Sequence, residues 1–416
     1  MKRLPIKGIP APQLIQDLES LRVDDVDWRS GRVFSLAYYA GPEAIAVAED
    51  AYRRFSGENA LSTDAFPSLR IMQTDVLSMV GPWLGADDES AGFMTSGGTE
   101  SILMVVKAAR DQFAQTNGVT TPNIVLPTSA HAAFEKACHY FGVESRRASV
   151  GTDWRADLHA IERLIDHNTV LVVASAPQYP QGVIDDVIGI ALLASSRGIN
   201  CHVDACMGGV TLAYLERLGQ HIPPWNLRVP GVTSISVDLH KYGYTSKGAS
   251  VVMYRNKALR AHQGFFTDNW LGGMYGSSGV LGTKSGGSIA SAWAVLQHLG
   301  EDGYSVLTQQ ARQATVQLAG HIADHPQLIL RAYPDTTLIC FGAKDPASLN
   351  VFAIADELRV RGWYVDRQTP PDSLHCTVNA IHHDKIDAFT RDLDECISAV
   401  QRNSQSGAVG HYGNLE

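Results

Sequence analysis

The sequence lacks any apolar run long enough to cross a membrane and any long run of lysine or arginine. No stretch of about 18 apolar residues occurs in the 416 residues, and none follows the basic start of the chain. We therefore expect neither secretion nor membrane insertion. The formal net charge of −9, without a basic cluster, argues against nucleic acid or an anionic membrane as a general partner. Any phosphate group must be bound locally.

Cysteine is scarce and irregularly spaced, and internal repeats and low-complexity segments are absent. The six cysteines form no CxxC pair and no zinc-finger spacing: Cys138, Cys201, Cys206, Cys340, Cys376 and Cys396. This spacing favours reduced, mostly buried thiols in a cytoplasmic protein. The composition, 45% hydrophobic and 19% charged, is that of a globular chain that buries a large core in two or more domains.

Apolar runs of strand length alternate with amphipathic patterns in the middle of the chain. The candidate strands are residues 123–128, 169–177, 200–205 and 234–239. The candidate helices between them are residues 100–114, 131–142 and 185–198. This alternation predicts an α/β domain with a largely parallel sheet.

The pattern changes near residue 300 to an α+β arrangement. Its candidate strands are residues 336–342 and 373–380, and its candidate helices are residues 349–362 and 386–401. We therefore expect an N-terminal arm at residues 1–60 with a helix at 44–56, a large domain at 61–300 and a small α+β domain at 301–416. The tail, residues 404–416, is expected to be frayed.

A His-Lys pair ends the strand-like run at 234–239 and enters a turn punctuated by glycine. An amine presented there, such as that of Lys241, can form a Schiff base with an aldehyde cofactor if it is desolvated and held near positive charge. The pair alone is weak evidence, because a lysine beside a loop is usually solvated. Three further features precede it: TSGGTES at 95–101, His131 after a strand, and HVDA at 202–205. In this order they predict a pyridoxal phosphate site.

The phosphate-binding candidate is the turn Ser96-Gly97-Gly98-Thr99, which directly precedes a helical pattern starting near Glu100. Glycines let backbone amides approach an anion, and a helix N-terminus adds roughly half an elementary positive charge. A Gly-Gly turn before a helix is common and by itself weak evidence. The turn indicates a phosphate site because it precedes His131, HVDA and the His-Lys pair in the chain order expected of a pyridoxal phosphate site.

Asp204 and His131 each have a functional and a purely structural interpretation. A carboxylate at the ligand-binding edge of the sheet, as expected for Asp204, can keep a pyridine nitrogen protonated. The same residue could merely cap a turn. His131 could stack on a cofactor ring or only start a helix. His202 and Asp204 could also join His131 or His240 as metal ligands. That reading leaves Lys241 and the glycine turn without a role, so no metal is expected.

Five segments of the chain resemble the sphingosine-1-phosphate lyase branch of the pyridoxal-phosphate-dependent group II decarboxylase superfamily. They are residues 95–111, 129–143, 202–209, 236–250 and 286–304, and the resemblance extends from about residue 30 to about residue 400. It implies a type I, aspartate-aminotransferase-like fold with a seven-stranded, mostly parallel sheet. It also implies a homodimer with the active site at the subunit interface.

The resemblance assigns roles position by position. Lys241 would be the Schiff-base lysine, Asp204 the pyridinium partner and His131 the stacking residue. The residues around the cofactor phosphate would be Ser96, Gly97, Gly98, Thr99 and His240, joined by Gly282 and Thr283 from the neighbouring subunit. Tyr38 and Lys247 match positions expected near the substrate.

Three positions depart from the lyase pattern where the substrate is expected. Ser62 and Gln181 stand where the lyases typically have histidine, and Lys284 stands where they usually have arginine. Lysine cannot reproduce the planar fork with which arginine grips a phosphate or carboxylate, and each lost histidine removes a possible cationic donor. The catalytic residues are therefore expected to be intact and the substrate pocket altered.

These features predict a lyase that breaks a carbon-carbon bond at the α-carbon of an amino substrate. Retro-aldol cleavage of a phosphorylated 2-amino alcohol matches the closer branch, and amino-acid decarboxylation is the alternative. A catalytically dead scaffold is disfavoured, because folding alone has little reason to keep both Lys241 and Asp204 buried. Sphingosine-1-phosphate itself is expected to be a poor substrate.

Overall fold

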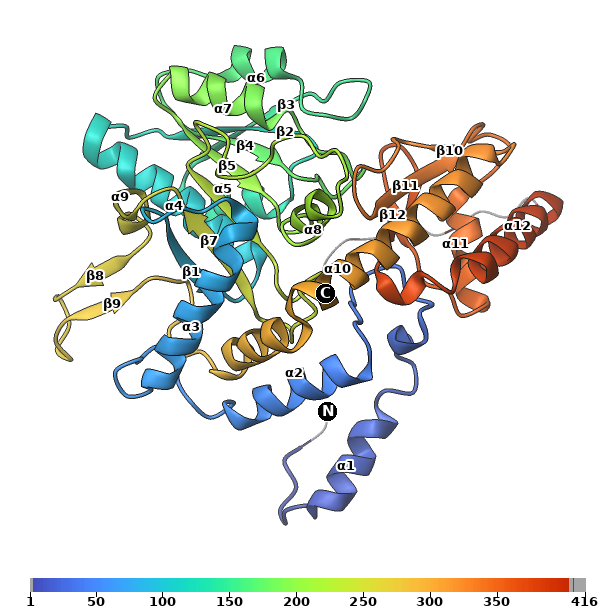
Figure 1. Ribbon diagram of the computed structural model, residues 1–416, viewed down its shortest axis with the longest axis horizontal. Coiled ribbons are helices and arrows are strands. Elements are labelled where there is room, and N and C mark those ends of the chain that lie inside the picture. The colour runs from blue at the N-terminus through green and yellow to red at the C-terminus, as the bar shows by residue number, and fades with distance from the viewer. Residues whose placement is uncertain (1–2, 404–406, 408–416) are drawn as a thin grey trace.

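The computed structural model describes residues 3–403 and residue 407 (Figure 1). Its larger sheet has seven strands in the order β1-β7-β6-β5-β4-β2-β3. The strands are β1 (Ala91–Thr95), β2 (Asn123–Pro127), β3 (Glu144–Ala148), β4 (Thr169–Ser175), β5 (Asn200–Asp204), β6 (Ser234–Val237) and β7 (Ser250–Tyr254). Only β7 runs antiparallel to its neighbours. The predicted seven-stranded, mostly parallel sheet is therefore confirmed.

Helices cover both faces of this sheet, so its central strands are apolar on both sides. On β4, Val172 enters one hydrophobic core while Leu171 and Val173 enter the other. The second core lies under α4 (Gly98–Asn117) and α5 (Ala133–Phe141). The opposite face is covered by other helices: α3 (Pro67–Val80), α6 (Leu158–Leu164), α7 (Val187–Ser196) and α8 (Thr211–Arg217). This two-sided burial explains why the strands read as continuous apolar runs.

A smaller antiparallel sheet forms the second core, in the order β10-β11-β13-β12. Its strands are β10 (Leu328–Leu330), β11 (Leu338–Ala343), β12 (Asp366–Gln368) and β13 (Ser373–Thr377). The helices α11 (Val351–Val360) and α12 (Ile386–Asn403) pack beside it. Phe34, from near the N-terminus, is fully buried in this core, and Val33 pairs with Tyr364. The segment around residues 33–34, although it precedes the large domain in the sequence, therefore packs on the small domain.

One long helix, α10 (Gly287–Asp324), connects the two cores. It is kinked at Gly300, whose φ of 58° is left-handed. Tyr304 and Leu307, beyond the kink, still pack in the core of the large sheet, so the domain boundary at residue 300 stays a prediction. The helix α2 (Pro42–Arg54) packs along α10. The helix α1 (Ala11–Ser20) has no buried residue, and the hairpin of β8 (Phe265–Thr267) and β9 (Tyr275–Ser277) projects from the large sheet after α9 (Lys257–Ala261) (Figure 1).

The predicted strands and helices are confirmed with small shifts at their ends. The helix expected near Glu100 begins at Gly98, and the helix expected from residue 131 begins at Ala133. The tail expected to be frayed lies outside the described residues apart from Gly407. No helix in the described ranges combines the length and the apolar character that crossing a membrane requires. All six cysteines are buried free thiols.

Candidate active site

Eight of the predicted residues line one cavity of about 370 Å³ at the carboxyl edge of the large sheet. They are Ser96, Gly97, Gly98, Thr99, His131, Asp204, His240 and Lys241. Each follows or ends a strand of the sheet: β1, β2, β5 or β6. Chain segments more than a hundred residues apart therefore meet where open α/β sheets bind their ligands.

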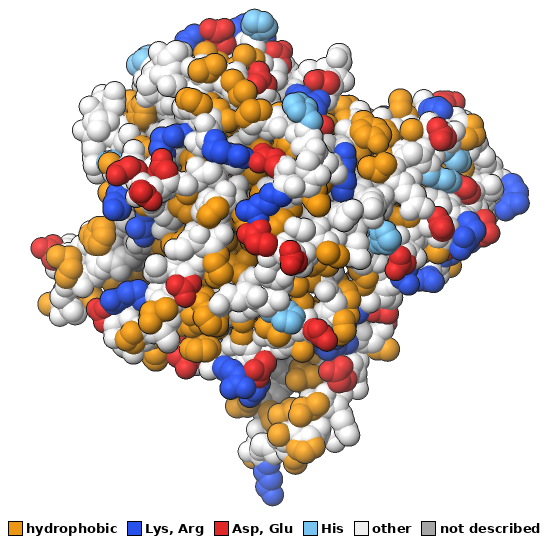
Figure 2. Space-filling view, in the orientation of Figure 1, with side chains coloured by type: hydrophobic (Ala, Val, Ile, Leu, Met, Phe, Trp, Pro, Cys, Tyr) orange, Lys and Arg blue, Asp and Glu red, His pale blue; other side chains and the backbone are white. Residues whose placement is uncertain are grey.

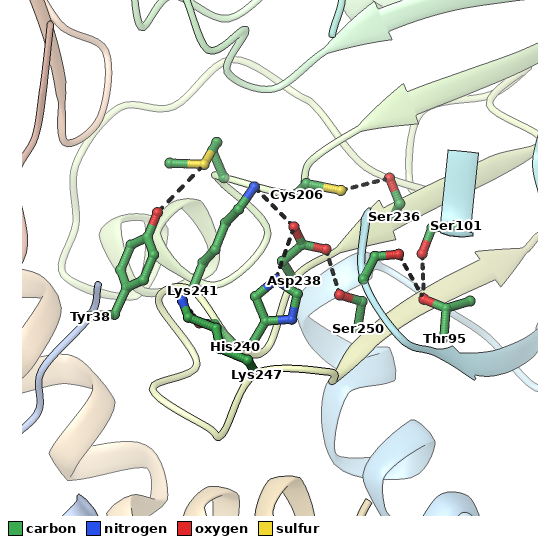
Figure 3. A network of polar contacts seen from close by, with 12 residues as sticks. Tyr38, Thr95, Ser101, Cys206, Ser236, Asp238, His240, Lys241, Lys247 and Ser250 are labelled. Carbon is green, nitrogen blue, oxygen red and sulfur yellow. Dashed lines mark hydrogen bonds and ion pairs between the residues drawn. The ribbon is translucent and has the colours of Figure 1, made fainter. Parts of the chain in front are cut away.

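The amine of Lys241 is held by a buried carboxylate that the sequence analysis did not single out (Figure 3). Its Nζ lies 2.9 Å from Oδ2 of Asp238, whose side chain is 2% exposed. Ser250 donates a hydrogen bond of 2.6 Å to the other oxygen of Asp238, and His240 lies 3.7 Å from the carboxylate. The only sequence signal was an acid three residues before the lysine, inside the motif itself.

Charge pairing outweighs burial at both groups of this pair. Burial disfavours the charged form of Lys241, but the charge of Asp238 holds the pKa of the amine well above its usual value. Burial likewise opposes ionisation of Asp238, yet the charge of Lys241, with that of His240 when it is protonated, lowers the pKa of Asp238 to about 2. The cavity therefore contains an ammonium-carboxylate pair at neutral pH.

The glycine turn is packed too tightly for a side chain. A Cβ on Gly98 would lie 2.8 Å from Sγ of Cys206 and 2.9 Å from Oδ2 of Asp238. Glu100 was also missed by sequence reasoning: it is buried and accepts from the backbone N–H groups of Ser96, at 2.6 Å, and Val280, at 2.7 Å. No side chain caps α4, so its first turn leaves backbone donors for an anion.

Asp204 and His131 each have a structural contact in addition to their place in the cavity. Oδ1 of Asp204 accepts from the Cys206 N–H at 3.1 Å, as a turn cap does. Nδ1 of His131 accepts from the Ala133 N–H at 3.1 Å, at the start of α5. Burial lowers the pKa of His131, which the charge of Asp204 only partly opposes. The capping contacts therefore coexist with a neutral ring and a carboxylate that both face the cavity.

Two buried polar atoms of the cavity wall have no hydrogen-bond partner within the described chain. They are Nδ1 of His240 and Oγ of Ser175, and both residues line the cavity. A buried polar atom without a partner costs free energy, so such atoms mark where a ligand binds. Together with the side-chain-free turn at Gly98 and the amine of Lys241, they fit pyridoxal phosphate.

Tyr38 and Lys247 lie together beside this cavity (Figure 3). Nζ of Lys247 is 5.1 Å from the centre of the Tyr38 ring and donates to the carbonyl oxygens of Leu36, at 3.0 Å, and His240, at 3.3 Å. The Tyr38 hydroxyl is 3.8 Å from Sδ of Met207, which lines the cavity. Burial, with the nearby charge of Lys241, lowers the pKa of Lys247 to about 8.

The other predicted residues lie away from the cofactor cavity of the same chain. Gly282 and Lys284 line a separate cavity of about 460 Å³, and Thr283 lies 3.4 Å from Asn59. Ser62 is exposed in the turn before α3. Gln181 is buried, bonded to Gln178, and faces a third cavity between the domains. A single chain thus brings together eight of the residues predicted to bind the cofactor, but not the three positions predicted to differ from the lyase pattern.

His202, considered above as a metal ligand, is fully buried between two serines. Its ring nitrogens lie 2.9 Å from Oγ of Ser234 and 3.2 Å from Oγ of Ser236. Within residues 3–403, no group of three or more histidine, cysteine or acidic side chains is arranged to hold a metal ion.

Comparison with known proteins agrees with this geometry. The pyridoxal-dependent decarboxylase conserved domain matches residues 2–344. The sphingosine-1-phosphate lyase of Oryza sativa subsp. japonica is 38% identical, over 96% of this chain and 75% of the relative, and that of Rattus norvegicus is 37% identical, over 99% and 72%. A probable L-aspartate decarboxylase of Thermococcus gammatolerans is 27% identical, over 94% and 99%.

Solved structures show the same fold. A sphingosine-1-phosphate lyase of Burkholderia pseudomallei superposes with a TM-score of 0.92 at 33% identity, covering 97% of this chain and 94% of that one. A glutamate decarboxylase of Lactobacillus brevis, at 19% identity and a TM-score of 0.85 over 98% and 96%, shares the architecture. With its lysine, carboxylate and glycine turn at one sheet edge, this chain belongs to the pyridoxal-dependent decarboxylase family and is a pyridoxal-phosphate-dependent lyase.

Proposed function

We propose that this lyase cleaves a carbon-carbon bond at the α-carbon of an amino substrate by retro-aldol chemistry, with a 2-amino alcohol, phosphorylated or not, as the substrate class. The observation that carries the proposal is the convergence of Lys241, Asp204 and His131 on one cavity. Two relatives that share 37–38% of their sequence with the chain are named sphingosine-1-phosphate lyases. Retro-aldol cleavage is the lyase reaction that we assign to this chain.

The cofactor supplies the electron sink that such cleavage needs, because pyridoxal phosphate draws electrons away from the α-carbon of an amine bound to it. In our proposal, Lys241 holds the cofactor through its amine and His131 packs against the ring. Asp204 keeps the pyridine nitrogen protonated. The phosphate is held by Ser96, Gly97, Gly98, Thr99 and His240.

Lys247 is the group that we assign to proton movement at the substrate. Retro-aldol cleavage requires a base for the substrate hydroxyl, and a base works best when its pKa is near the working pH. The pKa of Lys247, about 8, meets this condition, whereas that of Lys241 does not. Nζ of Lys247 also lies beside the cofactor cavity, above the Tyr38 ring. Tyr38 then orients the Lys247 amine toward the substrate.

Amino-acid decarboxylation is the second candidate, and a specific observation favours it. Ser62, Gln181 and Lys284 all replace residues that suit a phosphorylated substrate. Charge-assisted hydrogen bonds are worth about 1.5–3 kcal/mol each, so losing two would weaken transition-state binding by on the order of 10² to 10⁴. A decarboxylase does not need those contacts, and one relative is named an aspartate decarboxylase.

The segment at 282–284 completes the site, in our proposal, from the second subunit of a homodimer. In one chain it lies away from the cofactor cavity. Large apolar side chains are exposed on the β8–β9 hairpin and on α1: Leu14, Ile15, Leu18, Phe265, Phe266, Trp270, Leu271 and Met274. Figure 2 shows orange side chains at these two parts of the surface. Such patches mark interaction surfaces. The buried free thiols suit the cytoplasm, the compartment that we propose.

The test is incubation of the purified protein with amino acids and with 2-amino alcohols, phosphorylated and not, followed by mass spectrometry. Aldehyde release supports the lyase, and loss of carbon dioxide alone replaces it by the decarboxylase. Sphingosine-1-phosphate is expected to react poorly, and the triple variant Ser62→His, Gln181→His, Lys284→Arg is expected to cleave it faster. Efficient cleavage by the unaltered protein, with no gain in the variant, would show that these departures do not affect the substrate.

A further inference from the structure

A cavity larger than the cofactor site adjoins it between the two domains, and we name it the interdomain chamber. Its volume is about 940 Å³, and it shares His131 and Tyr179 with the wall of the cofactor cavity. The large domain contributes residues 128–132, the turn at 150–154 and residues 179–181, and the small domain contributes α11 and residues 363–371. The chemistry assigned to Lys241 does not need this additional space.

Trp154 stands on the wall of the interdomain chamber in a conformation that tryptophan rarely adopts. Its φ of 68° lies in the left-handed region, which favours glycine. Its N–H donates to the Gly151 carbonyl at 3.0 Å, and the next residue, Arg155, is bonded to Asp335 of the small domain at 2.6 Å. Backbone strain of this kind persists chiefly at functional sites. The turn therefore keeps a strained residue whose ring faces the chamber.

The wall of the chamber contains a buried hydroxyl without a hydrogen-bond partner within the described chain, that of Ser129. The residue is 6% exposed, and its Oγ has no hydrogen-bond partner within the described chain. It lines the chamber two residues before His131. A ligand oxygen at this end of the chamber would accept a hydrogen bond from this hydroxyl and remove the cost of leaving it unpaired.

The wall of the chamber carries two guanidinium groups, those of Arg359 and Arg367, and one carboxylate, that of Asp366. Its one carboxylate, Asp366, already accepts hydrogen bonds from Ser35 and, at 2.8 Å, from the Tyr179 hydroxyl. Arg367 pairs at 2.5 Å with a carboxylate outside the wall, that of Asp356. Arg359 lies with its guanidinium 5.3 Å from the centre of the Tyr364 ring and joins no ion pair among residues 3–403. Arg359 is therefore the guanidinium group of the wall that no ion pair among residues 3–403 already engages, and it is the first candidate donor to an anion.

We propose that the interdomain chamber binds the part of the substrate farthest from its amine, and that this part ends in an oxyanion, either a carboxylate or a phosphate. Arg359 is its donor, with Arg367 beside it in the same wall, and a planar guanidinium suits both groups. Ser129 donates to a substrate oxygen at the end of the chamber next to the cofactor cavity. The ring of Trp154 packs against the apolar chain that leads to it. This proposal rests on the proposed function, because it names the substrate class of the same site.

The first experiment measures binding of probes that lack an amine and so cannot react. Matched straight-chain compounds ending in carboxylate, phosphate or a neutral hydroxyl are titrated into the holoenzyme by calorimetry. The anionic probes should bind about tenfold or more tightly than the alcohol, because they gain a charge-assisted contact. Tighter binding of one anion than the other identifies the carboxylate or the phosphate as the natural end group. Equal binding of the alcohol, or no binding of any probe, overturns the proposal.

Matched variants locate the contact. Arg359→Gln with Arg367→Gln should abolish the preference for the anion. Arg361→Gln should keep it, because Arg361 pairs with Asp392 and Glu395 and does not line the chamber. Trp154→Gly removes the ring, suits the left-handed backbone and should weaken every long probe. An equal loss in the Arg361 variant, or none in the double variant, overturns the assignment.

Turnover provides the last readout, with 2-amino alcohols that differ only in their far end. An oxyanion at that end should lower KM at similar kcat, and the double arginine variant should raise KM alone. If no substrate reacts, the proposed function fails while the probe titrations still decide whether the chamber binds anions. If substrates react without preference for the oxyanion, the chamber proposal fails and the proposed function stands.

Discussion

Replacing Asp238 by asparagine should make the Lys241 amine reactive at a lower pH. The carboxylate is 2% exposed and 2.9 Å from Nζ, where an effective dielectric constant of about 20 gives an attraction of about 6 kcal/mol. Asparagine keeps the shape and removes the charge, so burial then acts with little opposition and lowers the pKa of the amine. The remaining groups that face the amine are Tyr38, His131, Asp204, Cys206, His240 and Lys247.

The assay is pH-dependent acylation of lysines in the cofactor-free protein by a neutral reagent, followed by peptide mass mapping. Lys247 is the internal reference, and its labelling should rise around pH 8. Near pH 8, Lys241 should stay unlabelled in the unaltered protein and should react about 10²-fold or more faster in Asp238→Asn. That factor corresponds to about 2.7 kcal/mol, which is about half of the Coulomb attraction that the substitution removes. Ser250→Ala, which loses a neutral hydrogen bond but keeps the charge, should change little.

The direction of the pH effect follows from the raised pKa of Lys241. Its ordinary value is 10.5, so the stability contributed by the pair is fully present below that pH and is lost as the pH rises through the higher folded value. If Lys241 labels identically in Asp238→Asn and in the unaltered protein, the carboxylate does not control the amine and the reasoning is refuted.

Four further predictions concern the cofactor, the dimer and the buried acids. Lys241→Ala should lose the visible absorbance of bound cofactor and its fixation by borohydride, and fixation at Lys247 instead would contradict the assignment. Asp204→Asn should lower turnover by about 10²-fold or more, roughly 2.7 kcal/mol, with a much smaller effect on cofactor affinity; equal, modest losses would make Asp204 structural. Mixed dimers of Lys241→Ala with a Thr283→Ala, Lys284→Ala variant should regain partial activity, and none in mass-confirmed heterodimers would place the segment in its own subunit's site. Burial raises the pKa of Asp185 from 3.8 to about 6, so its contribution to the free energy of unfolding, about 3 kcal/mol below pH 3.8, should fall as the pH rises to 6; urea titrations should show a flatter profile in Asp185→Asn.

Burial on both faces made the central strands predictable from sequence. The runs at β2, β4, β5 and β6 are apolar throughout, and each was expected within a few residues of its observed end. The edge strand β3, with the sequence ESRRA, was not expected, because its exposed position tolerates charge. The antiparallel direction of β7 depends on how residues 238–249 connect it to β6, and no local sequence pattern predicts that connection.

The candidate site divides in the same way. Lys241, Asp204 and His131 stood at strand ends, where parallel topology brings side chains together, so their convergence followed from chain order. Asp238 and Glu100 were missed because their importance lies in which atoms they approach, and an acid beside a lysine or a turn is common in any sequence. The interdomain chamber joins residues near 129 with residues near 367, and no spacing rule relates them.

The kink at Gly300 has a mechanical consequence. The first part of α10 is fixed in the core of the large sheet through Ile289 and Leu296, and its last turns are fixed in the small core through Leu318 and Ile322. Gly300 is the one residue of α10 with non-helical dihedral angles. Beyond the kink, Tyr304 and Leu307 still pack in the core of the large sheet, and the Tyr304 hydroxyl donates to the Gly243 carbonyl at 2.8 Å. The kink therefore turns the helix while its next two turns stay attached to the large domain. An alanine at Gly300 would be strained at φ 58°, so the glycine permits the change of direction that carries one helix from the large core to the small core.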